Sequence, residues 1–172
     1  MKTAPVICAL MLGAASTASA QTPSPFAPRA TLTTAAAEKI AKTCEAFGKA
    51  RNEKLAIVVV NNLGSAFYVY AMEGALEVAL DTAGRKAKTA WYFRTPTSAL
   101  AQRFANGPNT ASWMGLFPVS GAIPVMVDGQ VAGAVGVGGG GADEACAQAG
   151  LKAVGIDAPD PIARPAPAAP AR

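Results

Sequence analysis

The sequence predicts an α+β domain in which an antiparallel sheet is covered by helices. Two pairs of strand-like segments are each separated by a short turn signal, which is typical of β-hairpins. In the segments around them, apolar residues recur at the spacing of a helix face. The order along the chain is helix, hairpin, two helices, hairpin and helix, so the strands that pair are neighbours in sequence.

The first helix and the first hairpin occupy the start of the domain. Apolar residues at helical spacing predict a helix over residues 34–51, with Thr33 or Thr34 as its N-cap. The continuous apolar run "KLAIVVVN" (54–61) is consistent with a central strand. After the turn signal "NNLG", the segment "SAFYVYAM" (65–72) is expected to pair with it as an antiparallel strand.

Two helices are predicted between the hairpins. The longer covers residues 73–93, and its inward face is expected to carry Leu76, Leu80, Ala83, Ala87 and Ala90. A shorter helix is expected from about Ser98 to Phe104, with Thr97 as N-cap and the breaker Asn106-Gly107-Pro108 after it. An irregular loop follows over residues 109–121.

The second hairpin has the clearest local signal. In "AIPVMVDGQVAGAVGV" (122–137), Asp128-Gly129 favours a type I′ turn. Small residues dominate the second strand, which predicts that another element packs closely on that face. A last helix is expected over residues 143–155, with Ala145, Ala149 and Leu151 directed inward.

The beginning of the chain resembles a secretory signal peptide over residues 1–20. Lys2 supplies the positive charge, residues 6–15 form the apolar core, and Ala18-Ser19-Ala20 is a small-residue cleavage site. The apolar core is too short for a membrane span. We therefore expect a periplasmic or secreted protein with no integral membrane segment after processing.

Proline-rich segments flank the predicted domain. Residues 21–30 form a linker, and residues 157–172 form a Pro/Ala-rich tail that is expected to be disordered. The folded domain is then expected to cover residues 31–156, a length that fits one hydrophobic core.

The composition excludes several functional classes. With 15 Lys and Arg against 11 Asp and Glu, the positive charge is too small and too evenly spread for nucleic-acid binding. The chain has no histidine, which excludes Ser-His-Asp catalysis and metal sites built on imidazole. The sequence leaves the ligands of any metal undetermined.

Two cysteines, Cys44 and Cys146, remain after the signal peptide. An oxidising compartment would permit a disulfide, which by closing so long a loop could contribute about 4–5 kcal/mol. The alternative is two buried thiols that pack as small apolar groups. The sequence leaves both possibilities open.

A glycine-rich run, "VGVGGGGADE" (135–144), has the spacing of a dinucleotide-binding loop. That fold also needs a following parallel strand, whereas here a helix leads directly into the proline-rich tail. Asp143 and Glu144 stand in the first turn of that helix, where they repel phosphate. We therefore predict no NAD. The glycines either let the chain leave the sheet with positive φ angles or form an amide nest for a carboxylate.

Three segments resemble motifs of the GlcG/HbpS-like family, which is also found at the C-terminus of PduO-type proteins. They are "KAKTAWYF" (86–93), "SGAIPVMVDGQVAGAVGVGG" (120–139) and "DEACAQAGL" (143–151), in the family's order. The resemblance implies a profilin-like domain with α/β/α layers that forms homo-oligomers. Because some members bind heme or related tetrapyrroles, it also implies a small-molecule ligand of that class.

The chain departs from the family pattern at four positions. Asn61 stands where an aspartate usually ends the first strand, and Ala71 stands where arginine is usual. Ser120 replaces a glycine, and Gly138 replaces a serine. Each change removes a charge, a hydroxyl or a glycine, so the ligand can differ from that of the relatives.

The leading hypothesis is an exported, homo-oligomeric binding protein with a pocket between the helix at 73–93 and the last hairpin. Lys86, Arg94 and the amides of residues 138–141 are expected to attract ligand carboxylates, while aromatic and Met side chains cover an apolar ring. The predicted ligand-binding residues are Lys86, Thr89, Phe93, Arg94, Trp113, Met114, Gly121, Gly138 and Gly139. Candidate axial ligands for heme are Met72, Met114, Tyr68, Tyr70, the cysteines or a lysine.

Two other functions stay open. One is an enzyme that acts on a small organic acid or a redox cofactor, with Glu73, Asp81, Lys86 and the tyrosines as acid–base candidates. The other is a structural assembly module in which Trp113 and the small-residue strand serve subunit packing. Binding is favoured over catalysis because the sequence contains no histidine and no convergent pair of carboxylates.

Overall fold

A four-stranded antiparallel sheet forms the centre of the computed structural model, which describes residues 28–105 and 115–158. The predicted signal peptide, most of the linker and most of the tail lie outside these residues. The elements are α1 (Thr34–Ala50), β1 (Ala56–Val60), β2 (Ala66–Ala71), α2 (Glu77–Phe93), α3 (Thr97–Phe104), β3 (Ala122–Val127), β4 (Gln130–Gly138) and α4 (Asp143–Ala153). The strand order is β2-β1-β4-β3.

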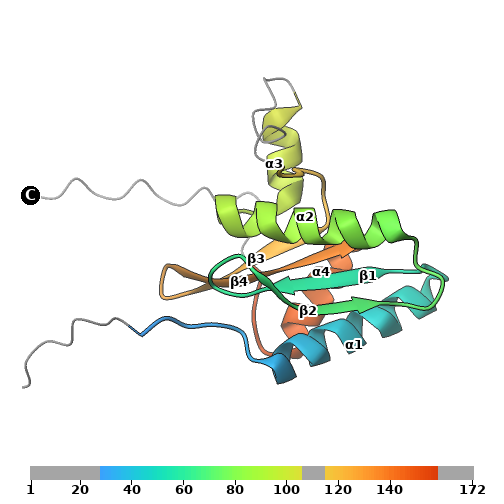
Figure 1. Ribbon diagram of the computed structural model, residues 1–172, viewed down its shortest axis with the longest axis horizontal. Helices are drawn as coiled ribbons and strands as arrows, with labels where there is room; N and C mark the ends of the chain where they lie inside the picture. Colours follow the sequence, from blue (N-terminus) through green and yellow to red (C-terminus); the bar gives the residue numbers. More distant parts are fainter. Residues whose placement is uncertain (1–27, 106–114, 159–172) are drawn as a thin grey trace, which may run out of the picture.

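Helices cover both faces of this sheet (Figure 1). One face packs against α1 and α4, and the other packs against α2. α3 projects away from these layers on the side of α2 (Figure 1). The predicted α+β fold with α/β/α layers is confirmed. Within the described residues, no helix has the length and apolar character needed to cross a membrane.

The two predicted hairpins are present, and β1 and β4 join them in the middle of the sheet. In the first turn, Asn61 Oδ1 accepts the N–H groups of Leu63 and Ser65 at 2.9 and 3.1 Å. In the second turn, Asp128 and Gly129 have φ angles of 49° and 73°. Both are left-handed, as a type I′ turn requires.

The face toward α1 and α4 holds the larger core, in which the aliphatic side chains of β1 and β4 pack against Ile40 and Leu151. Cys44 on α1 and Cys146 on α4 are fully buried there and form a disulfide. Their Cα atoms are 5.2 Å apart, within the range for disulfides. The bond therefore joins the two helices of this layer covalently.

On the opposite face of the sheet, small residues of β4 allow α2 to approach closely. A Cβ atom on Gly136 would lie 2.2 Å from the carbonyl oxygen of Ala83, and one on Gly138 would lie 2.3 Å from that of Ala79. The backbone of α2 therefore rests directly on β4, as the small residues of this strand predicted. At Gly136 and Gly138 this contact leaves no room even for a methyl group, so the expected pocket between α2 and the last hairpin cannot lie beneath this part of α2.

Two helices differ from their predicted form. α2 begins at Glu77 rather than at residue 73, because the N–H of Ala75 donates to the carbonyl of Met72 and Gly74 has a φ of +82°. This turn places Leu76 at the N-cap, where it is 70 % exposed rather than directed inward. α4 buries Cys146, Ala147, Gly150 and Leu151 rather than Ala145 and Ala149. Its rotation is set by the disulfide and by Gly150, on which a Cβ would lie 2.8 Å from Ile40.

We predict that Gly136→Ala lowers the free energy of unfolding by more than about 2 kcal/mol, because α2 must move away from β4. Gly84→Ala is the matched control, since nothing lies within 4 Å of a Cβ at this position of α2. This control should raise the free energy of unfolding by about 1 kcal/mol, the difference in helix propensity. Urea denaturation of both variants measures the effect, and equal stabilities would contradict the direct contact.

Candidate functional site

The predicted ligand-binding residues do not form one pocket. Lys86 and Gly121 lie in the interior, and Gly138 and Gly139 lie where β4 ends. Thr89 and Phe93 belong to the second half of α2, and Arg94 directly follows this helix. Trp113 and Met114 lie outside the described residues. The structure therefore divides the predicted set among three places around α2.

Lys86 is a buried cation with a partner inside the protein. Its side chain is 6 % exposed, and Nζ lies 2.7 Å from Oδ2 of Asp143 and donates to the carbonyl of Val137 at 3.1 Å. A Cβ on Gly121 would lie 2.8 Å from the same Nζ, so a glycine with φ of +139° borders the pair. The charge of Lys86 is thus compensated by Asp143, and the expected pairing with a ligand carboxylate has no support in this geometry.

The amides of the glycine run also meet carboxylates of the protein itself. The N–H of Gly140 donates to Asp143 Oδ1 at 2.8 Å, and that of Gly141 donates to Glu53 Oε1 at 3.1 Å. Gly139 has a φ of +103°, which turns the chain out of the sheet toward α4. The run therefore forms a turn in which the N–H groups of Gly140 and Gly141 donate hydrogen bonds to carboxylates of the protein itself.

The sequence interpretation missed the role of Glu144, whose side chain is buried. Its carboxylate accepts the N–H of Ser98 at 3.0 Å, the N–H of Gly121 at 3.2 Å and the hydroxyls of Ser98, Thr97 and Ser120. It thereby satisfies the free amide at the start of α3, where Pro96 is the N-cap and provides no side-chain bond. The predicted N-cap Thr97 instead accepts the N–H of Ala122 at 2.9 Å. Only the tertiary fold brings this acceptor and its donors together.

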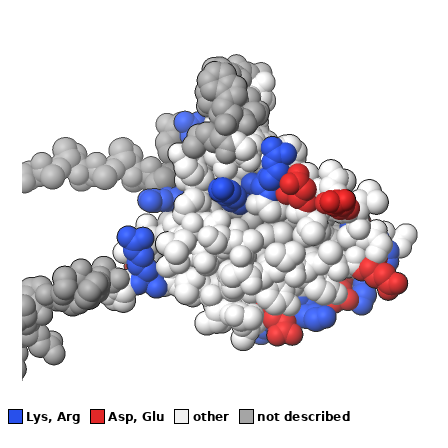
Figure 2. Space-filling view, viewed as in Figure 1, with Lys and Arg blue, Asp and Glu red and all other residues white. Residues whose placement is uncertain are grey.

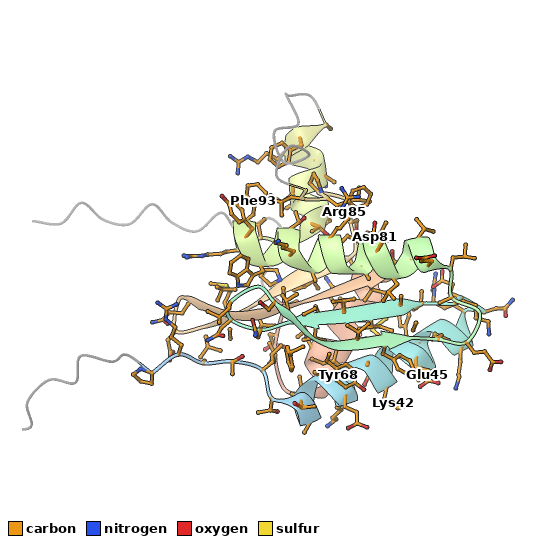
Figure 3. The ribbon with its side chains drawn as sticks, viewed as in Figure 1. Lys42, Glu45, Tyr68, Asp81, Arg85 and Phe93 are labelled. Carbon is orange, nitrogen blue, oxygen red and sulfur yellow. A yellow bond between two sulfur atoms is a disulfide. The ribbon has the colours of Figure 1, made fainter. Side chains whose placement is uncertain are left out.

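Thr89 anchors the chain that enters β3. Its fully buried hydroxyl donates to the carbonyl of Arg85 and accepts the N–H of Phe117, both at 2.7 Å. The guanidinium of Arg85 lies 5.1 Å from the centre of the Phe117 ring. The hydroxyl of Thr89 is thus fully used within the fold, and Arg85 lies on the side of α2 that faces away from the sheet (Figure 3).

The C-terminal end of α2 carries a half-buried aromatic pair. The Phe93 ring, labelled in Figure 3, lies at the end of α2 next to α3. Its centre lies 5.8 Å from that of the Phe104 ring on α3. Arg94 follows at once and ends the helix in the left-handed conformation, with φ of 54° and ψ of 36°. An apolar surface and a cation therefore adjoin at this end of α2.

Arg94 lines a cavity of about 260 Å³ together with Arg29, Asn62 and Gln130, here named the arginine cavity. Arg29 lies in the segment before α1, which is fixed by the buried side chain of Leu32. Within the described residues, no carboxylate approaches either guanidinium to 4.0 Å. Basic side chains gather at this end of the molecule, on the left of Figure 2. Such a site favours anions.

The candidate axial ligands are mostly engaged elsewhere. Met72 is buried, and its sulfur accepts the N–H of Leu55 at 3.3 Å. A hydrogen bond with Glu45 raises the pKa of Tyr70 and keeps its phenol protonated, which disfavours coordination of iron. Tyr68 lies on the α1 side of the sheet, away from Phe93 (Figure 3). The described residues contain no group of three or more acidic or Cys side chains able to hold a metal ion.

The acid–base candidates are dispersed. Asp81 is exposed and lies 3.7 Å from Arg85, and Glu73 lies in the exposed turn before α2. The most perturbed carboxyl is Glu45 on α1, where hydrogen bonds to Lys49, Tyr70 and Lys42 lower the pKa to about 2. This group lies on the outer surface of α1 and β2 (Figure 3), where it stabilises the contact between these two elements.

Comparison with known proteins gives the family. A model of the family described as "Haem degrading protein HbpS-like" matches residues 32–152. The chain belongs to the HbpS-like family. The match covers all four strands and α1 to α3, and it ends one residue before the end of α4.

Relatives of known sequence or structure agree with this assignment. An uncharacterised 15.0 kDa protein from the dhaT-dhaS intergenic region of Citrobacter freundii is 34% identical in an alignment 119 residues long that covers 64% of this chain and 82% of that protein. The crystal structure of a double mutant of Streptomyces reticuli HbpS has a TM-score of 0.71 at 29% identity, over 80% of this chain and 97% of that one. A PduOC–heme complex shares the fold, with a TM-score of 0.67 at 22% identity, over 73% and 96% of the two chains.

We predict that Lys86→Met lowers the free energy of unfolding by about 3–5 kcal/mol, because it leaves the buried Asp143 carboxylate without its cation. The double variant Lys86→Met/Asp143→Asn should recover much of this loss. Lys88→Met, an exposed position on the same helix, is the control and should change stability by less than about 0.5 kcal/mol. Urea denaturation of wild type and of these variants measures the changes in the free energy of unfolding. If Lys86→Met left the stability unchanged but weakened ligand binding, this result would support the predicted pairing of Lys86 with a ligand carboxylate instead.

A second prediction concerns acid stability. Since the pKa of Glu45 is lowered from 4.5 to about 2 in the folded protein, its stabilising effect is complete above about pH 4.5 and is lost as the pH falls toward 2. The difference in urea midpoint between wild type and Glu45→Gln should therefore shrink over this range. Glu38→Gln, exposed on the same helix, is the control. A difference that stays constant with pH would argue against the Glu45 interactions.

Proposed function

We propose that this protein binds heme or another tetrapyrrole at the C-terminal end of α2. The observation that carries the proposal is the position of two arginines, Arg29 and Arg94, in one cavity, with Arg94 directly following Phe93 of the aromatic pair Phe93 and Phe104. A tetrapyrrole combines a flat apolar ring with carboxylate side chains. Its two chemical parts therefore match the two parts of this surface.

The charge at the arginine cavity favours carboxylates in particular. A guanidinium presents parallel N–H donors that fit the two oxygens of a carboxylate, and such charge-assisted bonds are stronger than neutral ones. At about 260 Å³, the cavity is smaller than the usual pocket for a whole organic ligand. It would hold the carboxylate end, while the ring would lie against Phe93 and Phe104.

Family membership supports this ligand class. The family is described by haem degradation, and one structural neighbour is a heme complex. Bound iron would supply the redox and ligand-binding chemistry of the group. The residues of this chain would supply its carboxylate partners and its apolar contact. Because the chain has no histidine, the iron would lack an imidazole ligand from this protein.

We also propose that the protein is exported and forms homo-oligomers. Residues 1–20 have the pattern of a secretory signal, which supports a periplasmic or secreted location. Exposed apolar side chains, including Leu63, Val69 and Tyr92, support subunit contacts. Fractionation of the native host and light scattering of the purified protein test these two points.

Titration with hemin tests the ligand proposal. Wild type should shift the Soret band with micromolar or tighter affinity, and Arg29→Ala/Arg94→Ala should bind at least about tenfold more weakly, because two charge-assisted contacts are lost. Phe93→Ala should also weaken binding. Lys88→Ala removes one exposed positive charge from the same helix and should bind as wild type does.

Iron-free protoporphyrin is the companion probe. If the arginines and phenylalanines carry the affinity, protoporphyrin should bind with a dissociation constant close to that of hemin and with the same response to the variants. Absence of hemin binding by wild type, or equal binding by all variants, would reject this site.

A further inference from the structure

The strand β2 lies at one edge of the sheet, and among the described residues no strand pairs with its outer side. The N–H of Met72, which directly follows β2, donates to the carbonyl of Leu55 at 2.9 Å and therefore points toward β1. Because the direction of the hydrogen-bonding groups alternates along an antiparallel strand, the N–H and C=O groups of Val69 and Ala71 point away from β1. The outer side of β2 thus presents main-chain donors and acceptors to a further strand.

The other edge of the sheet is protected against such pairing, whereas β2 is not. On β3, the same alternation directs the backbones of Ala122 and Pro124 outward. Thr97 accepts the N–H of Ala122 at 2.9 Å, and Pro124 has no N–H to donate. Residues 66–71, "AFYVYA", contain no proline and no charged residue. An edge strand without either device is expected to pair with another strand.

The surface around the outer edge of β2 is uncharged. Val69 is 54 % exposed, and Ala71 is also exposed. β2 lies between α1 and α2 in Figure 1, and Figure 2 shows a broad surface without Lys, Arg, Asp or Glu between the charged groups of these two helices. Glu45 of α1 is paired with Lys42 and Lys49 at 3.2 and 2.8 Å. The strand itself therefore offers main-chain groups and apolar side chains rather than charge to a partner.

We propose that β2 pairs antiparallel with β2 of a second copy of this chain, so that two four-stranded sheets join into one continuous sheet. This inference rests on the homo-oligomer proposed above and names its interface. With Tyr70 on a twofold axis, Val69 would lie opposite the partner subunit's Ala71. The outward N–H and C=O groups of both residues would then be hydrogen-bonded in both copies.

A second copy fits this edge better than a peptide of another kind. A twofold contact brings each side chain near its own equivalent, which is unfavourable when the side chains are charged. β2 avoids this repulsion because none of its residues is charged. A single added peptide strand would leave its own outer edge open, whereas the twofold pair leaves neither copy of β2 with a free edge.

Amide hydrogen exchange of the full chain, followed by NMR together with light scattering, tests this pairing. We expect a dimer, or a larger assembly of dimers, in wild type. The N–H of Ala71 should exchange at least about tenfold more slowly in wild type than in the dissociated variant Val69→Lys, since it gains a hydrogen bond. The N–H of Tyr70 is the internal reference, because it points toward β1 and should stay protected in both proteins.

Two substitutions at one position should separate the copies. Val69→Lys places a charge in the interface, and Val69→Pro removes an outward donor without removing a hydrogen bond to β1. Val127→Lys is the matched control, since Val127 is 40 % exposed on the other edge strand, and this variant should keep the oligomeric state of wild type. Circular dichroism checks that all three variants keep the fold.

The outcomes distinguish this interface from the proposed homo-oligomer in general. Wild type that stays monomeric at all concentrations would contradict both. An oligomer that survives both Val69 variants, or in which the N–H groups of Val69 and Ala71 exchange freely, would reject the β2 pairing alone. Slow exchange of these amides in a monomer would show that another segment of the chain covers the edge, which also rejects the pairing.

Discussion

The start of α4 connects elements on both faces of the sheet through two adjacent carboxylates. Asp143 reaches Lys86 of α2, on the opposite face, at 2.7 Å. Glu144 accepts the N–H of Ser98 and thereby holds the first turn of α3. Because both carboxylates are buried, each needs its own donors, and the positions of α2 and α3 follow from that requirement. The surface between Phe93 and Phe104 depends on it in turn.

The contact of α2 with β4 explains why the candidate ligand site lies at an end of this helix. Gly138 stands where the family pattern has serine, and a Cβ there would lie 2.3 Å from the Ala79 carbonyl oxygen. The centre of α2 is thus closed to ligands, while its two ends leave the sheet and border cavities. Two of the other departures have structural roles as well, since Asn61 caps a turn and Ser120 donates to Glu144.

Local sequence patterns predicted most of the fold. Asp128-Gly129 defined the second hairpin because few residue pairs adopt two positive φ angles, and the small residues of β4 indicated a close neighbour. The residues of the candidate site could be predicted only in part from such local patterns. Phe93 and Arg94 were found because they adjoin in sequence, whereas Arg29 was missed because its proximity to Arg94 arises only when the chain folds.

The sequence by itself determined the elements, the antiparallel pairing within each hairpin and the family, because hydrophobic periodicity, turn chemistry and motif order are local properties. Only the tertiary structure decided which charged groups pair with other groups of the protein. Lys86 and the amides of the glycine run were expected to bind a ligand. Instead they form hydrogen bonds with the carboxylates of Asp143 and Glu53. A charged group meets whichever opposite charge the packing brings within a few ångströms. That neighbour can be more than fifty positions away along the chain, as Asp143 is from Lys86.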